Sequence, residues 1–293
     1  MRKNNRLQTG SRLAVAPYTV WSVLFVVVPL IFVAYYAFTE GDIRSGDLTF
    51  TFDNLTRFFT ETGGDGSAAP KYLLIFWRSL KLAIIATAIC LLLAYPLAYF
   101  MTRMSAKAQK TVMTLIMIPM WMNFLIRTYA WMTILKDTGI INNLLGKLGF
   151  GTIRIIGTEG AVLIGMVYDY LPYMVLPIYS ILAKMDDKLI EAARDLDCNG
   201  FSVFRRVIFP LSLPGVVSGI TMVLIPSIST FYISQKLGSG HFYLIGDAIE
   251  QQYVANNLHF AAAIAFILMV ILLAAMAVMQ YFSNRFANGG AEK

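Results

Sequence analysis

Asp169 is the residue whose type and surroundings point most directly to chemistry. It lies within the apolar run 160–183, with Tyr168 directly before it and Tyr173 one helical turn further on. A carboxylate beside aromatic rings suits an organic cation, through ion pairing and cation–π attraction. A charge at membrane depth is costly, so it faces either a cavity or a partner. The residue types leave open whether Asp169 binds a substrate or pairs with a basic residue and holds helices together.

Arg127 is the expected partner in the second case. It lies in another apolar run, 111–135, where it shares a helical face with Trp131. Its long side chain can also snorkel toward water at the interface. Pairing with Asp169 or snorkelling is therefore favoured over contact between Arg127 and a substrate.

Hydroxyl side chains mark a third apolar run. Ser227, Thr230 and Ser234 follow Pro226 at spacings that place them on one helical face. These hydroxyls either line a hydrophilic path or restore the hydrogen bonding that Pro226 disrupts, and the second role is favoured. The candidate substrate path comprises Asp169, Tyr168, Tyr173, Trp131, Arg127, Ser227 and Thr230.

A polar segment, 184–213, separates two of the apolar runs. Within it, Leu189, Ala192, Ala193 and Leu196 recur at i, i+3, i+4 and i+7, which predicts one face of a helix. Glu191 lies on the other side. The two alanines stand where a core helix carries larger side chains, so another protein can approach this face closely.

The same helix has signals for its start and its end. Asp186 and Asp187 are candidate N-caps, and Asn199-Gly200 is a candidate left-handed stop. The sequence therefore predicts a helix that continues to Asn199.

The composition excludes an ordinary soluble domain. Of the 293 residues, 57% are hydrophobic and 14% are charged, and the apolar runs are long enough to cross a bilayer as helices. We expect six spans, at 18–38, 74–101, 111–135, 160–183, 214–234 and 259–282. The first is read as an uncleaved span, because it is too long for a signal peptide and no cleavage site follows it.

Basic residues set the expected orientation. The termini, 102–110 and 184–213 hold fourteen Lys and Arg residues, against seven in the three loops on the other side. The positive-inside rule places the richer side in the cytoplasm, together with both termini. The net charge of +7 follows from this asymmetry, and no basic surface interleaved with aromatic residues predicts nucleic-acid binding.

Other chemistries find little support in the sequence. His241 and His259 have no carboxylate at ligand spacing, so no metal site is expected. Gly-rich 237–240 lacks the Lys of a phosphate-binding loop, so energy from ATP must come from another subunit. An intramembrane enzyme needs a reactive pair at membrane depth, and Asp169 is the single acid expected there; a channel needs a selectivity filter, which is not visible.

The polar segment resembles a motif of a known family. Glu191-Ala192-Ala193, closed by Phe209-Pro210, is similar to the cytoplasmic "EAA" loop of ABC importer permeases, although Asp197 stands where that family has a glycine. Three further stretches, 124–132, 168–179 and 249–252, resemble the spermidine/putrescine (PotB-type) branch. The resemblance implies a turn at Asp197 rather than at Asn199.

This resemblance implies an all-α integral membrane protein with six transmembrane helices and the type I ABC importer permease (MetI-like) architecture. The expected domains are a cytoplasmic N-terminus (1–17), a first helix with an external loop (18–74), the permease domain (75–283) with its coupling loop (184–213), and a cytoplasmic tail (284–293). The residues expected to couple to the ATPase are Glu191, Ala192, Ala193, Leu196, Asp197, Gly200, Phe209 and Pro210.

The implied setting is the bacterial inner membrane. The implied partners are a second, PotC-type permease, an ATPase dimer that holds ATP and Mg, and an extracytoplasmic binding protein that delivers polyamines. An importer permease for another solute, such as a metal chelate or an organic ion, is the alternative.

Overall fold

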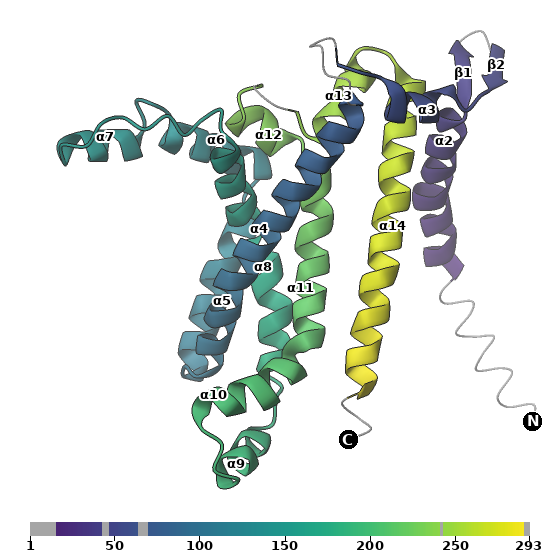
Figure 1. Cartoon of the computed structure of the whole chain (residues 1–293). Coiled ribbons are helices and arrows are strands. Elements are labelled where there is room, and N and C mark those ends of the chain that lie inside the picture. The colour runs from purple at the N-terminus through teal and green to yellow at the C-terminus, as the bar shows by residue number, and fades with distance from the viewer. Residues whose placement is uncertain (1–15, 43–46, 64–69, 241–242, 290–293) are drawn as a thin grey trace, which may run out of the picture. The chain divides into compact units, whose positions relative to one another are not determined.

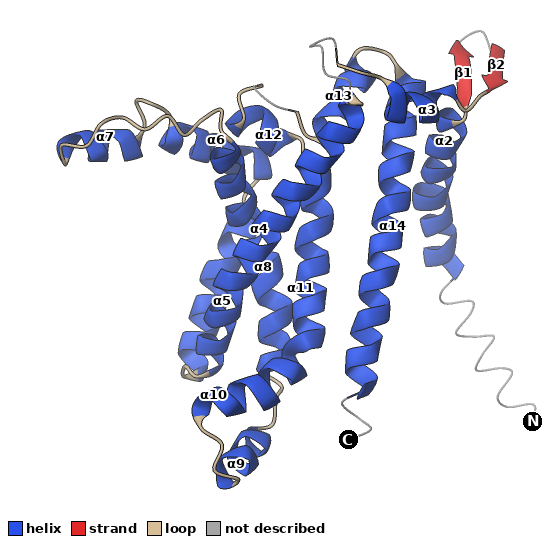
Figure 2. Ribbon diagram, viewed as in Figure 1, coloured by secondary structure: helices blue, strands red, loops and turns tan. Residues whose placement is uncertain are grey.

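The computed structural model describes residues 16–42, 47–63, 70–240 and 243–289. These residues are helical almost throughout, with one small hairpin of strands (Figures 1 and 2). The chain divides into two compact units, Met1–Tyr72 with Ile249–Val270, and Leu73–Ala248 with Ile271–Lys293. Of the expected termini, 1–15 and 290–293 lie outside the described residues, whereas 16–17 and 284–289 are helical.

The elements in chain order are η1 (Val23–Val27), α2 (Val28–Ala37), β1 (Thr39–Asp42), β2 (Asp47–Phe50), α3 (Asp53–Thr60), α4 (Lys71–Thr102), α5 (Ala106–Trp121), α6 (Phe124–Leu135), α7 (Ile140–Lys147), α8 (Glu159–Leu182), α9 (Asp187–Asp195), α10 (Gly200–Val203), η2 (Phe204–Ile208), α11 (Phe209–Ser229), α12 (Tyr232–Leu237), α13 (Ile245–Val254) and α14 (Leu258–Gly289).

Five helical stretches of the described chain are long and apolar enough to cross a membrane. They are Ala16–Ala37, Lys71–Thr102, Glu159–Leu182, Gly200–Ser229 and Leu258–Tyr281. A bent pair, Ala106–Trp121 with Phe124–Lys147, supplies a sixth if it is counted as one span. The predicted six-span architecture therefore depends on a span that is not straight.

The third predicted span, 111–135, is wrong as a continuous helix. The chain turns by 95° between α5 and the helices that follow. Pro119 lies in the last turn of α5, where its ring removes a backbone donor. Asn123 then starts α6, because its Oδ1 accepts a hydrogen bond of 2.8 Å from the backbone N of Leu125.

In the first unit, His259 ties α14 to the segment that follows α2. Its Nδ1 lies 3.2 Å from the carbonyl oxygen of Tyr36, and its Nε2 lies 3.0 Å from that of Gly41. The hairpin β1–β2 begins within this segment and pairs Thr39 with Phe50. The external loop expected in 18–74 thus contains a hairpin and α3.

In the second unit, α4, α5, α8 and α11 lie side by side (Figure 1). The contact between α8 and α11 is close because Gly215 and Gly219, four residues apart, face α8. A Cβ on Gly215 would lie 2.9 Å from the carbonyl oxygen of Pro177 and 3.2 Å from the Cα of Ile178. The two backbones therefore approach as only glycine allows.

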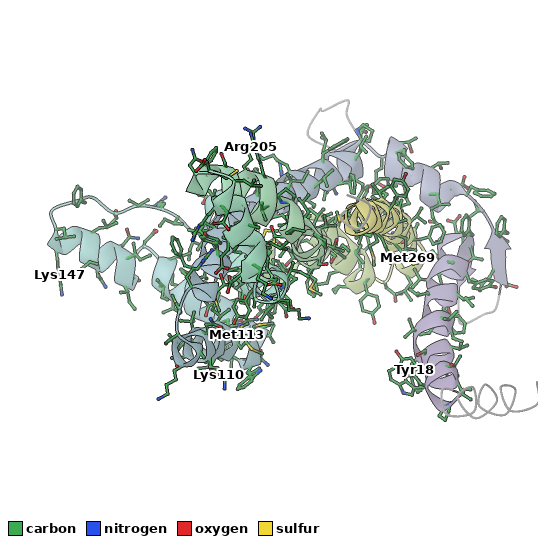
Figure 3. The ribbon with its side chains drawn as sticks, turned by 90° about the horizontal axis from the view of Figure 1, so that it is seen from below. Tyr18, Lys110, Met113, Lys147, Arg205 and Met269 are labelled. Carbon is green, nitrogen blue, oxygen red and sulfur yellow. The ribbon has the colours of Figure 1, made fainter. Side chains whose placement is uncertain are left out.

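The helix α9 lies at one end of this bundle, and α6, α7 and α12 lie at the other (Figure 1). Figure 3 shows Lys147, at the end of α7, far from the bundle. Asn142 braces this arm: its Nδ2 donates to the carbonyl oxygens of Lys136 and Ile153, at 3.1 and 3.0 Å.

Candidate functional site

The predicted helix of the polar segment forms as α9, and it starts where expected. Asp186 is its N-cap, and its Oδ1 accepts a hydrogen bond of 3.0 Å from the backbone N of Lys188. Asp187 in the first turn and Arg194 in the last complement the helix dipole. The N-cap prediction for Asp186 is confirmed.

The predicted end of this helix at Asn199 is wrong, and the turn implied by the family resemblance is found. Asp197 has a left-handed φ of 56°. The backbone N of Asp197 donates to Arg194 O at 2.9 Å, and that of Cys198 donates to Ala193 O at 3.3 Å. This pair of bonds is a Schellman motif, in which aspartate occupies the position that usually holds glycine.

Asn199 has a different role from the one predicted. Its Oδ1 accepts a hydrogen bond of 2.8 Å from Ser202 N, so it is the N-cap of α10. Gly200 is the first residue of α10 and has open space around its Cα. As an N-cap, the side chain of Asn199 satisfies a backbone N–H of the first turn of α10 that has no partner within the helix.

The face of α9 that was predicted to be apolar is mostly exposed. Leu189 is 49% exposed and Leu196 is 79% exposed. Ala192 is also exposed, whereas Ala193 is half-buried against the core. The anchor is instead Ile190, which is buried in the core of the bundle and was not singled out from the sequence.

A cavity of about 300 Å³ lies beside α9, where α9 meets the ends of α4, α5 and α8. Its lining includes Arg103, Gln109 and Asp187. The helix is therefore held at Ile190 without close packing along its whole length. Glu191, on the exposed surface of α9, faces no described residue of the bundle closely enough to pair with it.

Phe209 and Pro210 link the polar segment back to the bundle. Pro210 lies just after the π-helical turn Phe204–Ile208, inside the continuous helical stretch Gly200–Ser229, so its missing backbone N–H coincides with a local change in the hydrogen-bond ladder. The ring of Phe209 lies 5.9 Å from that of Tyr95 and 6.2 Å from that of Phe204. Tyr95 is also hydrogen-bonded to Ser212 at 2.8 Å. This aromatic joint connects the polar segment to α4 and α11.

The second candidate site is the buried pair of Arg127 and Asp169. Arg127 Nη1 in α6 lies 3.1 Å from Asp169 Oδ1 in α8, and the two side chains are 7% and 3% exposed. Of the two roles left open for Asp169, ion pairing is the one seen here. Arg127 does not snorkel to the interface, because its guanidinium is buried.

The aromatic candidates surround this pair unequally. The rings of Trp131 and Tyr168 meet edge to face at 5.2 Å, so they brace α6 against α8. Tyr173 is 38% exposed, one helical turn from Asp169. A path from the surface to the carboxylate would therefore begin at Tyr173.

The hydroxyl face predicted after Pro226 is interrupted. The helix α11 ends at Ser229, and Thr230 is extended, so Ser234 belongs to α12. Ser227 and Thr230 are both buried near the end of α11. Ser227 Oγ makes no hydrogen bond with the described residues, so the predicted repair of the helix by Ser227 is wrong.

One buried polar junction was not predicted from the sequence. Asp247 Oδ2 accepts hydrogen bonds of 2.7 Å from Ser234 Oγ and from Leu244 N. Ser79 in α4 accepts one of 2.7 Å from Ile245 N. Gly246, the second residue of α13, allows this helix to approach the end of α11, because a Cβ there would lie 2.5 Å from the Ser229 carbonyl oxygen.

These features define a class of membrane transport protein. The family of binding-protein-dependent transport system inner membrane components matches residues 91–288. That range contains α9, the aromatic joint and the buried ion pair, and the chain belongs to this family. It is therefore a multi-pass transport component of the membrane and not an enzyme.

Particular relatives are closer. The chain is 36% identical to the spermidine/putrescine transport system permease protein PotB of Haemophilus influenzae, over 99% of this chain and 98% of that protein. It is also 36% identical to PotB of Escherichia coli K12, over 93% of this chain and 97% of that protein. The resemblance to PotB-type permeases is confirmed.

Solved structures show the same fold. A chain of a bacterial alginate ABC transporter, in complex with an alginate pentasaccharide-bound periplasmic protein, matches with a TM-score of 0.72 over 100% of this chain and 99% of that one, at 15% identity. A chain of the MetNI methionine ABC transporter matches with a TM-score of 0.52 over 74% and 94%, at 19% identity. The predicted type I importer permease fold is confirmed.

Proposed function

We propose that this chain is a permease subunit of an ATP-driven importer that takes up polyamines, spermidine and putrescine being the cargo of its relatives. The observation that carries this proposal is the 36% identity to PotB over nearly the whole length of both chains. A buried carboxylate among aromatic rings in the bundle supports a cationic cargo over an anionic one.

The importer works through partners. A PotC-type permease would complete the translocation path, because the spans of one chain are too few to enclose a sizeable polar cavity. An extracytoplasmic protein would deliver the cargo, and two ATPase subunits would hold ATP and Mg. This arrangement belongs in the bacterial inner membrane, with both termini and the coupling loop 184–213 in the cytoplasm, as the excess of Lys and Arg favours. The permease domain would span 75–283.

The exposed part of α9 is the proposed contact with the ATPase. Leu189, Ala192 and Leu196 offer an apolar surface, and Glu191 adds a charge beside it. When ATP closes the ATPase dimer, α9 would move with it, and the Schellman turn at Asp197 and the joint at Phe209-Pro210 would pass that movement to α11. Gly200, in open space, leaves room for the docking partner.

Replacing Glu191 with Arg tests this docking. In cells that carry the importer, we expect the variant to reach the membrane at normal abundance while uptake of labelled spermidine falls about tenfold or more, because a charge reversal in an interface typically costs more than 1.4 kcal/mol. Lys147→Glu reverses a charge on the distal α7 and is the control. Normal uptake by Glu191→Arg would contradict the docking role, whereas failure of the unmodified importer to take up spermidine would contradict the cargo.

The proposed orientation has its own test. Cys198 lies next to the turn of α9 and is partly exposed, whereas Cys90 is buried. A membrane-impermeant maleimide should label Cys198 in inverted vesicles and not in intact cells, and Cys90 serves as the internal control. Labelling of Cys198 from outside would place α9 where no ATPase can reach it.

A further inference from the structure

The ion pair between Arg127 and Asp169 is closely spaced but poorly hydrogen-bonded. The two charged groups are 3.1 Å apart. Even so, Arg127 Nε, Arg127 Nη1 and Asp169 Oδ1 are buried and make no aligned hydrogen bond with the described part of the chain. The contact thus has charge attraction without the hydrogen-bond geometry of a tight guanidinium–carboxylate fork.

An ion pair with this geometry contributes little net stability to the contact between α6 and α8. Removing two charges from water costs several kcal/mol per ion, which is recovered only when good geometry and additional hydrogen bonds satisfy the remaining donors and acceptors. Each buried donor or acceptor left unsatisfied costs about 1–3 kcal/mol more. A pair kept only to join α6 and α8 would be expected to use its hydrogen-bonding groups more fully.

The surroundings of Asp169 suit a second occupant. Arg127 Cζ lies over the ring of Phe124, 5.9 Å from its centroid, which shows that a cation is already accommodated against an aromatic face. The half-exposed Tyr173 lies one turn from Asp169. Unsatisfied acceptors and aromatic rings are the groups that an alkylammonium ion needs.

The element that carries Arg127 is also placed to move. The chain bends by 95° just before α6, and the residues between α5 and α6 are Met122 and Asn123. A few residues at an element terminus can absorb the dihedral change of a hinge. Arg127 follows this bend by one turn of α6, so a small rotation there withdraws the guanidinium from α8.

We propose that Arg127 is an internal stand-in for the cargo cation at Asp169, and that an ammonium group of the polyamine displaces it during transport. The exchange conserves charge: the buried carboxylate changes one cation for another and is never left alone, while the released guanidinium turns toward the aqueous path. Cargo arrival is thereby linked to movement of α6. This proposal rests on the polyamine cargo proposed above and assigns Arg127 a positioning role rather than direct contact with the cargo.

The deciding variant is the double substitution Arg127→Gln with Asp169→Asn. It removes both charges, Asp169→Asn at nearly constant volume and Arg127→Gln with a shorter side chain, so no charge is buried alone, and it should fold even where either single variant does not. The matched control is Lys81→Gln with Glu159→Gln, which removes an exposed ion pair of 2.7 Å that also joins two helices of the bundle. Both are tested in cells that carry the whole importer, by membrane abundance and by initial uptake of labelled spermidine.

Displacement of Arg127 by the cargo and a purely structural ion pair predict different results. If Asp169 receives the cargo, the double variant should be as abundant as the unmodified chain but take up spermidine at least about tenfold more slowly, because the cation has lost its charged partner. The control pair should retain normal uptake. Where Arg127→Gln alone is stable, it should retain most of its uptake, whereas Asp169→Asn should not.

Normal uptake by the double variant would overturn the exchange and leave a static pair. Equal losses in the two single variants that are both recovered in the double variant would do the same. Loss of the double variant from the membrane would also contradict the proposal, because it would show that the charges are required for folding. Absence of spermidine uptake by the unmodified importer would instead refute the proposed cargo, so the two failures are distinguishable.

Discussion

The glycine contact between α8 and α11 gives a quantitative test of the fold. Gly215→Ala adds one methyl group, which would lie 2.9 Å from the carbonyl oxygen of Pro177 and 3.2 Å from the Cα of Ile178. Both are backbone atoms, so the neighbour cannot move away by rotating a side chain. Overpacking of this kind costs about 1–3 kcal/mol.

The same change has a favourable part, because alanine is about 1 kcal/mol better than glycine within a helix. Backbone neighbours place the overlap toward the upper part of its range, so the net loss of stability should be about 1–2 kcal/mol. Gly160→Ala, in the first turn of α8, is the control. Its Cβ would meet only Thr158 Oγ1, at 3.5 Å, which is ordinary contact. It should be neutral or stabilising by up to about 1 kcal/mol.

The measurement is unfolding of the purified chain in mixed micelles with increasing SDS, followed by far-ultraviolet circular dichroism. The two variants should differ by about 1–3 kcal/mol, with Gly215→Ala the less stable. Equal midpoints would refute the reasoning, because they would mean that α8 and α11 do not meet at the observed distance.

Three further predictions concern the polar segment, the first unit and the arm 136–153. Asp197→Gly should stabilise the chain by about 0.5–1 kcal/mol, because aspartate has a left-handed φ of 56° there, whereas Ala192→Gly, inside α9, should destabilise it by about 1 kcal/mol; the same SDS titration measures both. His259→Ala should cost about 1–3 kcal/mol, because the ring contacts the carbonyl oxygens of Tyr36 and Gly41 and the one that accepts its N–H loses that donor, and it should speed proteolysis within 37–42; an unchanged rate would show that the ring does not hold this segment. Asn142→Ala should speed cleavage of the 136–153 arm by a similar loss of bonds, and cleavage at the unchanged rate would refute the bracing.

The sequence predicted the spans well where apolar length alone decides them. The run at 160–183 became α8, and the run at 74–101 became most of α4, because a long apolar helix has few alternatives in a bilayer. Periodicity could not show the break in the third span. Trp121 and Met122 are apolar on both sides of the bend, so the run continues where the helix does not.

The candidate sites were predicted in part. The cap at Asp186 and the possible pairing of Asp169 with Arg127 followed from residue types, because both depend on strong and specific interactions. The turn at Asp197 could not be chosen over Asn199 from composition, since asparagine is suited both to stop a helix and to start one. Ile190 was missed as the anchor of α9 because a single buried side chain leaves no periodic pattern.

The length of α5 bears on how lipid surrounds the molecule. The helix has 16 residues, and at 1.5 Å per residue it is about 24 Å long, whereas the hydrocarbon layer is about 30 Å thick. Beyond Trp121 the chain turns aside, so several ångströms of the layer beside it lack a straight helical wall. Acyl chains cannot form hydrogen bonds with the backbone groups that are exposed where α5 ends, so protein or water must lie against these groups. The backbone at Met122 and Asn123 is therefore a place where protein or water, rather than lipid, must lie against the bundle.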